Sequence, residues 1–296
     1  MAHAENERRN GRHGLDAWGG LMACMLALLL AIAPAAWAQF ETEMERKLDE
    51  FVRGTLRSDN PLVLAADGAN LTPQQVAVME TRLLENPNDL ASRARLLGYY
   101  FANEGRNPSL RRARFAHIYW LIRNQGGSEL AASRYVAIDP RENLDAWQKA
   151  RDMWLAQVQA NPRNTGILRN AGDFLIEESP DEAEAIYTQG GRVEPANAMW
   201  PARLGMLFTL QSSKREGLEK ERLQQRALEA YEEAVRLARR EERVGLLAEA
   251  TRAALAAGNT DRARQYAQQI GVAAAEGDGE LLHLAHTLLG IVALRS

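Results

Sequence analysis

Apolar residues recur at three- and four-residue steps along much of the chain, which is the spacing of an amphipathic α-helix. In residues 42–57 this spacing builds one helix face from Met44, Leu48, Phe51, Val52 and Leu56. Thr72-Pro73 indicates the start of another helix, because threonine caps helix N-termini and proline is tolerated at the first helical position. Ala, Leu, Arg and Glu dominate the second half, and this mixture favours helix over strand. The pattern therefore predicts an all-α fold.

Two stretches interrupt the helical pattern. Residues 59–70 are predicted to form a linker, and residues 125–141 form a second irregular segment that Pro140 breaks. The chain is thus expected to have an N-terminal part before residue 71 and a larger helical domain over residues 71–296.

A group of residues recurs with a period that is too long for a single helix. Ala150, Trp154, Gln157 and Pro162 are followed 33 residues later by Ala183, Tyr187, Gly190 and Pro195. The alanine lets two helices approach closely, the aromatic residue one turn later fills the space between them, and the proline ends the helix. A third copy of the pattern is Ala227, Tyr231 and Ala234. Such self-similarity is typical of a helical repeat array.

The helix before each of these sets has its own pattern, seen in Leu97-Gly98-x2-Phe101 and Leu204-Gly205-x2-Phe208. Together the two patterns resemble the tetratricopeptide repeat (TPR), a helix-turn-helix unit of about 34 residues. The unit over residues 164–197 matches best, at Ala171, Phe174, Ala183, Tyr187 and Pro195, although Asn170 replaces the expected leucine.

The resemblance covers roughly residues 86–296, and the stretches NPNDLASRARLLGYYF and HIYWLI are also similar to exported bacterial TPR proteins. The unit from about residue 198 carries ten extra residues before Ala227, which predicts longer helices there. The resemblance implies a solenoid of antiparallel helix pairs over residues 71–296. The alternative is an irregular helical bundle.

The N-terminus has the order of a secretory signal peptide. Arg8, Arg9 and Arg12 precede an uncharged apolar run, which ends at the small-x-small site Ala36-Trp37-Ala38. Residues 1–38 are therefore predicted to be a signal peptide, leaving residues 39–70 as an N-terminal helix and linker. A periplasmic or secreted protein is expected. The alternative is an uncleaved anchor formed by residues 21–38, whose length is near the lower limit for a membrane span.

Cys24 is the only cysteine, and cleavage would remove it with the signal. The mature chain would then contain no disulfide and no thiolate nucleophile.

Charge gives no reason to expect a nucleic-acid partner, since the formal net charge is −3. Two local basic clusters exist, Arg111/Arg112/Arg114 and Arg239/Arg240/Arg243. Both are interpreted as solvated helix faces, with binding of an acidic partner as the alternative.

Candidate catalytic and metal-binding residues are few, and we expect no cofactor and no catalytic site. His117, His283 and His286 are the histidines that remain after signal removal. His283 and His286 share a helix face and could bind a metal, but Glu280 lies on another side of that helix. A metal-binding or enzymatic module at the His283/His286 face is therefore the alternative function, and packing in the last helix pair is the simpler interpretation.

The TPR resemblance implies a binding groove lined by the second, fifth, ninth and twelfth residues of each first helix. In this sequence those positions are Ser92, Arg95, Tyr99 and Ala102 in one unit, and Met199, Ala202, Met206 and Thr209 in another. We therefore expect an exported scaffold that binds a protein or peptide, with Arg95, Tyr99, Met199 and Met206 as partner-binding residues. Alternatively, Tyr99 and the two methionines are core residues, and Arg95 is a solvated charge.

The C-terminal helix carries more apolar residues than one buried stripe accommodates: Leu281, Leu282, Leu284, Leu288, Leu289, Ile291, Val292 and Leu294. It resembles the first helix of a further unit. We expect a docking edge, covered by a second copy or by a partner, unless the chain is a truncated form of a longer array.

Overall fold

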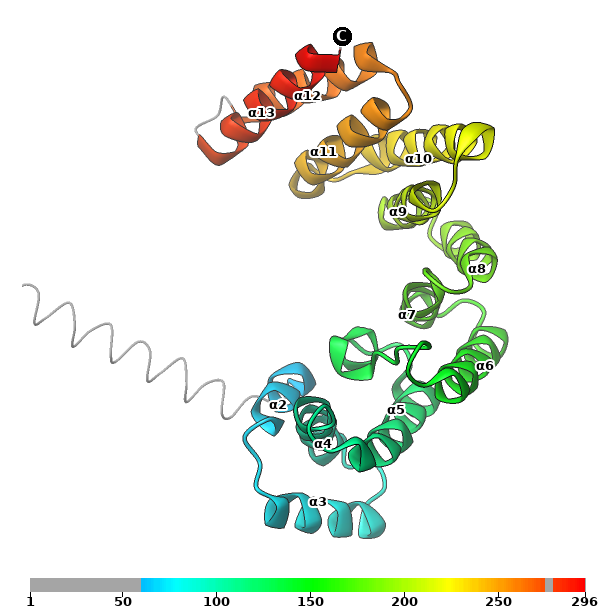
Figure 1. The fold of residues 1–296 in the computed structure, drawn as a ribbon, viewed down its shortest axis with the longest axis vertical. Helices are drawn as coiled ribbons and strands as arrows, with labels where there is room; N and C mark the ends of the chain where they lie inside the picture. The colour runs from blue at the N-terminus through cyan, green and yellow to red at the C-terminus, as the bar shows by residue number, and fades with distance from the viewer. Residues whose placement is uncertain (1–59, 275–278, 296) are drawn as a thin grey trace, which may run out of the picture. The chain divides into compact units, whose positions relative to one another are not determined.

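A computed structural model describes residues 60–274 and 279–295 (Figure 1). All regular elements in these residues are helices, and strands are absent from them, which confirms the predicted all-α class. The described residues from 64 onward belong to one compact unit, Leu64–Ser296. The predicted signal peptide and the predicted helix over residues 42–57 lie outside the described residues.

The described helices follow one another along the chain, and each packs on the next from α3 onward. The α-helices are α2 (Pro61–Gly68), α3 (Pro73–Glu85), α4 (Leu90–Asn103), α5 (Arg111–Gln125), α6 (Leu144–Ala160), α7 (Thr165–Leu175), α8 (Pro180–Val193), α9 (Met199–Ser213), α10 (Gly217–Leu237), α11 (Arg240–Ala256), α12 (Thr260–Ala274) and α13 (Gly279–Arg295). Short 3-10 helices are η1 (Pro108–Leu110), η2 (Leu130–Ala132) and η3 (Arg134–Val136). None of the described helices combines the length and the apolar character that crossing a membrane requires.

The start of α3 agrees with the sequence. The Thr72 hydroxyl accepts a hydrogen bond from the Gln75 backbone N–H at 3.3 Å, and the Gln75 side chain accepts one from the Thr72 N–H at 2.8 Å. This reciprocal pair is a capping box, with Pro73 at the first helical position.

Residues 61–68, predicted to belong to a linker, instead form α2. Ala65 and Gly68 are buried, and a Cβ atom on Gly98 of α4 would lie 1.7 Å from the Ala65 carbonyl oxygen. Only glycine allows this close approach of the two backbones. The short α2 is therefore stabilised by tertiary contact with α4, which local sequence patterns do not report.

A contact between a glycine and a tyrosine ring occurs in both the α7–α8 pair and the α9–α10 pair. A Cβ atom on Gly172 of α7 would lie 2.3 Å from the Tyr187 ring of α8, and one on Gly205 of α9 would lie 2.8 Å from the Tyr231 ring of α10. A glycine in the first helix thus makes room for a tyrosine ring from the second. The helix α10 has 21 residues, in line with the lengthening predicted for this unit.

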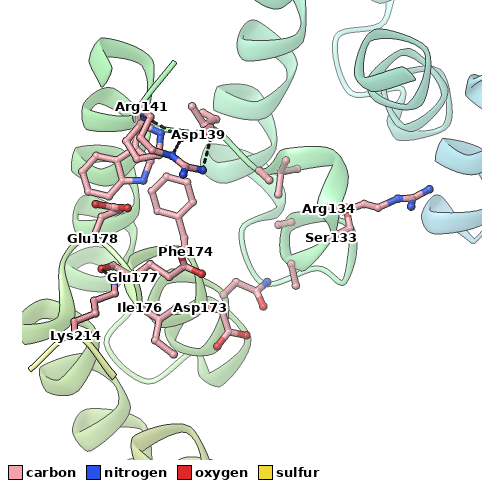
Figure 2. A pocket seen from close by; sticks show the side chains of 18 residues that line it. Ser133, Arg134, Asp139, Arg141, Asp173, Phe174, Ile176, Glu177, Glu178 and Lys214 are labelled. Carbon is pink, nitrogen blue, oxygen red and sulfur yellow. Dashed lines mark hydrogen bonds and ion pairs between the residues drawn. The ribbon is translucent and has the colours of Figure 1, made fainter. Parts of the chain in front are cut away.

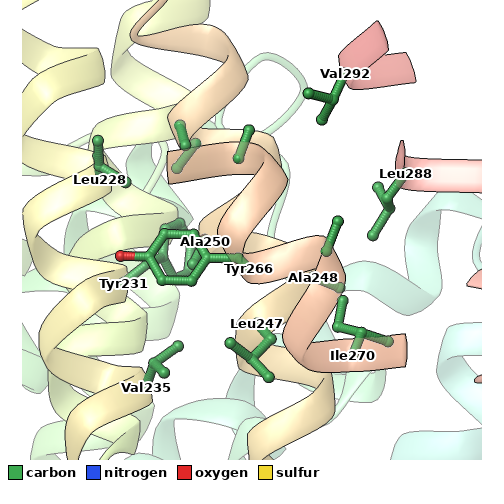
Figure 3. Close-up of a cluster of buried hydrophobic side chains, with 14 of the residues drawn as sticks. Leu228, Tyr231, Val235, Leu247, Ala248, Ala250, Tyr266, Ile270, Leu288 and Val292 are labelled. Atoms are coloured by element: carbon green, nitrogen blue, oxygen red, sulfur yellow. The ribbon is translucent and has the colours of Figure 1, made fainter. Parts of the chain in front are cut away.

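The last four helices share one apolar cluster, which includes Tyr231, Leu247, Tyr266 and Ile270 (Figure 3). Ala285, Leu288 and Val292 of α13 complete it. Leu288 is therefore a core residue, whereas Ile291 is 38% exposed and Leu294 is 89% exposed. The side chains of Leu281, Leu282 and Leu284 lie outside the described residues.

Candidate binding site

A buried arginine holds the irregular segment between α5 and α6. The Arg114 guanidinium donates to the carbonyl oxygens of Tyr135, at 3.0 and 3.2 Å, and of Ala137, at 2.6 Å. It also forms an ion pair with Glu104 at 2.9 Å. Burial lowers the pKa of Arg114, and the Glu104 carboxylate opposes that effect. Arg114 thus fixes the backbone of the segment rather than facing solvent, which corrects the predicted solvated cluster at this residue.

A buried asparagine holds the beginning of the same segment. The Asn170 side-chain amide donates to the carbonyl oxygens of Gly126 at 2.8 Å and Ser128 at 2.9 Å. Asn170 is the residue that replaces the leucine of the repeat pattern. Since a leucine could not donate to these carbonyls, the departure from the pattern has a structural reason.

The fixed segment and α7 enclose a pocket of about 610 Å³, which we call the α7 pocket (Figure 2). Its apolar lining includes Val136 and Ile138 of the segment, Trp147 of α6, and Phe174 and Ile176 at the end of α7. The Trp147 and Phe174 rings are stacked, with centroids 5.7 Å apart and planes inclined by 14°. The pocket therefore offers a firm apolar surface for a ligand side chain.

Charged side chains of both signs surround this apolar lining. Asp139 and Arg141 are joined by two hydrogen bonds of 2.8 and 3.0 Å, which lower the pKa of the Asp139 carboxyl. Glu177 and Glu178 are exposed, and within the described residues their carboxylates form no ion pair. Lys214 donates to the Glu177 backbone carbonyl at 3.3 Å. Figure 2 shows these side chains together with Phe174 among the residues that line the pocket.

Asp173 also lines the pocket, but its carboxylate is already in use. Tyr187 of α8 donates its hydroxyl proton to Asp173 Oδ1 at 2.8 Å, and Arg203 of α9 forms an ion pair with Oδ2 at 3.0 Å. Burial raises the pKa of Asp173, and the two partners reduce that effect. Asp173 therefore connects three successive helices.

The lining of the α7 pocket contains neither histidine nor cysteine. Its one hydroxyl, on Ser133, donates to the Leu130 carbonyl at 2.7 Å. The polar groups of the lining are therefore mainly carboxylates, guanidinium groups and one ammonium group.

The predicted partner-binding residues lie on α4 and α9, and none of the four lines the α7 pocket. Tyr99 is half-buried, packs edge-on against Tyr100 with ring centroids 5.5 Å apart, and joins the apolar cluster between α3 and α4. Arg95 is half-buried, and Gly68 of α2 lies against its backbone carbonyl. Met199 and Met206 are half-buried on α9. Ser92, also predicted to face the groove, is buried.

The histidines predicted as an alternative site are both exposed on α13. Across the described residues, no three side chains of His, Cys, Asp or Glu are grouped as a metal site requires. In the second basic cluster, Arg239 forms an ion pair with Glu242 at 2.6 Å.

The comparisons with known proteins give no family. No protein-family model matches the chain, and a search of the curated proteins found no match. The resemblance to TPR proteins therefore rests on the repeat pattern of the sequence itself.

Sequence reasoning missed the α7 pocket because its lining comes from an irregular segment and from the end of a helix. Asn170 was the one available signal. A polar residue at a position that the repeat reserves for leucine indicates that a backbone segment must be satisfied nearby.

Proposed function

We propose that the chain is an exported helical-repeat scaffold of the TPR type, which holds an extended segment of a partner protein in the α7 pocket. The repeated glycine–tyrosine contact of the α7–α8 and α9–α10 pairs, together with the period of 33 residues, supports a solenoid of helix pairs. The signal-like residues 1–38 support a periplasmic or secreted location.

The observation that carries this proposal is the composition of the α7 pocket. An apolar or aromatic side chain of the partner would pack against the half-buried Phe174 ring, which stacks on the buried Trp147 ring. Polar groups of the same segment would meet Glu177, Glu178 and Lys214 around it. Binding clefts commonly combine an apolar interior with a few polar groups that fix orientation.

A displayed library of random peptides, selected on the purified full-length chain, tests this proposal. We expect the selected sequences to bind the unmodified chain and to lose binding to the Ala132→Trp variant. Ala132 is an exposed residue of the pocket lining, so a large ring there fills the pocket and disturbs no core contact.

The matched control is Ala256→Trp, at an exposed alanine near the end of α11 that does not line the pocket. Selected peptides should bind this control as they bind the unmodified chain. Equal binding to both variants would place the ligand elsewhere and overturn the proposal.

A further inference from the structure

A second depression lies between the start of α5 and α6, and we call it the α5–α6 pocket. Its lining includes Arg111, Arg112, Phe115 and Tyr119 of α5, Asn143, and Lys149 of α6. It shares no lining residue with the α7 pocket. The two pockets are therefore separate surfaces, and each can be tested by its own substitutions.

The α5–α6 pocket has a surplus of positive charge. Arg112 and Lys149 are exposed, and neither has an ion-pair partner in the part of the chain that the structure describes. Arg111 pairs through one nitrogen with Glu142 at 2.9 Å, which leaves its other donors available. The lining thus contains three cations and no carboxylate, in a chain whose formal net charge is −3. Such a local reversal of sign attracts acidic groups.

Aromatic rings lie directly beside these cations. Lys149 Nζ is 4.4 Å from the centroid of the Tyr119 ring, which is a cation–π contact. The Tyr119 hydroxyl donates to the Ala146 carbonyl at 3.2 Å, so the ring is held in place against α6. Phe115, one helical turn earlier, is also half-buried in the lining. A ligand of this surface therefore needs apolar groups as well as negative charge.

The sequence alone suggested a different set of cations. Of the cluster Arg111/Arg112/Arg114, Arg114 does not belong to the basic surface, because it is buried and holds the irregular segment. In its place Lys149 joins from the next helix, 37 positions after Arg112 in the sequence. The basic surface is thus a product of the packing of α5 on α6.

We propose that the α5–α6 pocket is a second binding site, which takes an acidic protein segment containing an aromatic or large aliphatic residue. Carboxylates of that segment pair with Arg112 and Lys149, while its apolar side chain packs against Phe115 and Tyr119. A bare inorganic anion would use the cations but leave the rings without a partner, so the lining favours a peptide. This site is additional to the scaffold function and does not depend on the α7 pocket.

Fluorescence anisotropy with a labelled short peptide rich in Asp and Glu, and containing two phenylalanines, tests the proposal on the full-length chain. Binding should weaken as salt is added, because exposed charges are screened. The double variant Arg112→Glu/Lys149→Glu should bind the peptide at least about tenfold more weakly, since two attractive pairs become repulsive. Replacing the phenylalanines of the probe by serine should also weaken binding.

The matched control is the double variant Lys220→Glu/Arg222→Glu, which makes the same change in net charge on the exposed surface of α10 and lies outside both pockets. It should change the affinity by less than about twofold. Equal weakening by both double variants would mean that the net charge of the chain, rather than this pocket, determines the affinity, and it would overturn the proposed site. Unchanged binding to Arg112→Glu/Lys149→Glu would overturn it as well. If circular dichroism shows that this variant is misfolded, Arg112→Gln/Lys149→Gln replaces it.

Two further measurements separate the proposal from its rivals. In the first, inorganic phosphate competes with the labelled probe. If phosphate displaces the probe as effectively as unlabelled peptide does, and if replacing the phenylalanines has no effect, the pocket is a simple anion site and the peptide proposal is overturned. The Ala132→Trp variant should keep full affinity for the acidic probe. If it loses that affinity, the probe binds in the α7 pocket and the second site is wrong.

Discussion

Nη1 of Arg93 lies 3.1 Å from Nδ1 of His117, and both side chains are buried. A guanidinium group only donates hydrogen bonds, so Nδ1 must accept and the imidazole carries its proton on Nε2. Nε2 then donates to Glu80 at 2.9 Å, and the Tyr100 hydroxyl donates to the same oxygen at 2.5 Å. A neutral imidazole thus connects a buried cation on α4 with a carboxylate on α3.

This network makes stability depend on pH through Glu80. Burial raises the pKa of Glu80, but the hydrogen bonds from His117 and Tyr100 outweigh it and hold the pKa below the ordinary 4.5. The unfolded chain therefore binds the proton more tightly, so Glu80 contributes stability above pH 4.5 that is lost as the pH falls through its folded pKa. Urea unfolding at a series of acidic pH values measures this.

Glu80→Gln should lower the free energy of unfolding near neutral pH and flatten its decline below pH 4.5. The matched control is Glu85→Gln, at an exposed residue of the same helix. If Glu80→Gln and the unmodified chain show the same dependence of stability on pH, the Glu80 carboxylate is not the source of this dependence.

Restoring the repeat pattern at Asn170 should destabilise the chain. Asn170→Leu leaves the carbonyl oxygens of Gly126 and Ser128 without their donor, at a cost of about 1–3 kcal/mol in the free energy of unfolding. Urea denaturation gives the value. A rise in the free energy of unfolding would mean that leucine is the more stable residue at position 170 and that these two hydrogen bonds contribute little.

The glycine–tyrosine contact gives a prediction with an internal control. Gly172→Ala should lower the free energy of unfolding by about 1–3 kcal/mol, because the new methyl group meets the Tyr187 ring. In Gly191→Ala, on α8, the methyl group would lie at an ordinary 3.7 Å from Trp200, so stability should hold or rise by up to about 1 kcal/mol. Thermal melts of the two variants side by side measure the difference, and equal effects would refute the close contact.

Arg95 and Tyr99 are still predicted to contact the partner. Once a partner is known, Arg95→Ala should weaken its binding by roughly 2 kcal/mol or more if Arg95 is an interface residue. An unchanged affinity, combined with a lower melting temperature for Tyr99→Ala, would mean that the pair is structural. Because Tyr99 packs against Tyr100, the melting temperature of Tyr99→Ala measures how much this ring contributes to stability.

The C-terminal helix is predicted to be a docking edge, and sedimentation at micromolar concentration tests self-association. Ile291→Glu/Leu294→Glu should shift the chain toward monomer, because these side chains are exposed while Leu288 is core. Leu84→Glu changes an exposed leucine of α3 and serves as control. A chain that is monomeric without any substitution would rule out the version with a second copy.

Sequence patterns predicted those parts of the fold that depend on neighbouring residues. The capped start of α3 at Thr72 and the irregular stretch broken by Pro140 follow from local backbone preferences. The helix α2 was missed because its burial depends on Gly98, which lies far along the chain.

The candidate sites were harder to predict for the same physical reason. The sequence predicts a surface charge at Arg114, because the carbonyls that it binds belong to residues more than 20 positions away. Likewise, Lys149 joins Arg112 only through the packing of α5 on α6. Contacts of this kind depend on where helices meet, and a repeat pattern describes the helices rather than the insertion between them.

Arg114 and Asn170 hold the irregular segment by its carbonyl oxygens, and a carbonyl is the same whatever side chain its residue carries. The attachment of the segment is therefore separate from the surface that it presents to the α7 pocket. Exposed residues such as Ala132 and Ala137 can be exchanged without loosening that attachment. The two polar anchors thus hold the segment independently of its side chains, so the surface of the proposed binding site could be altered by substitution while the helices beneath it stay the same.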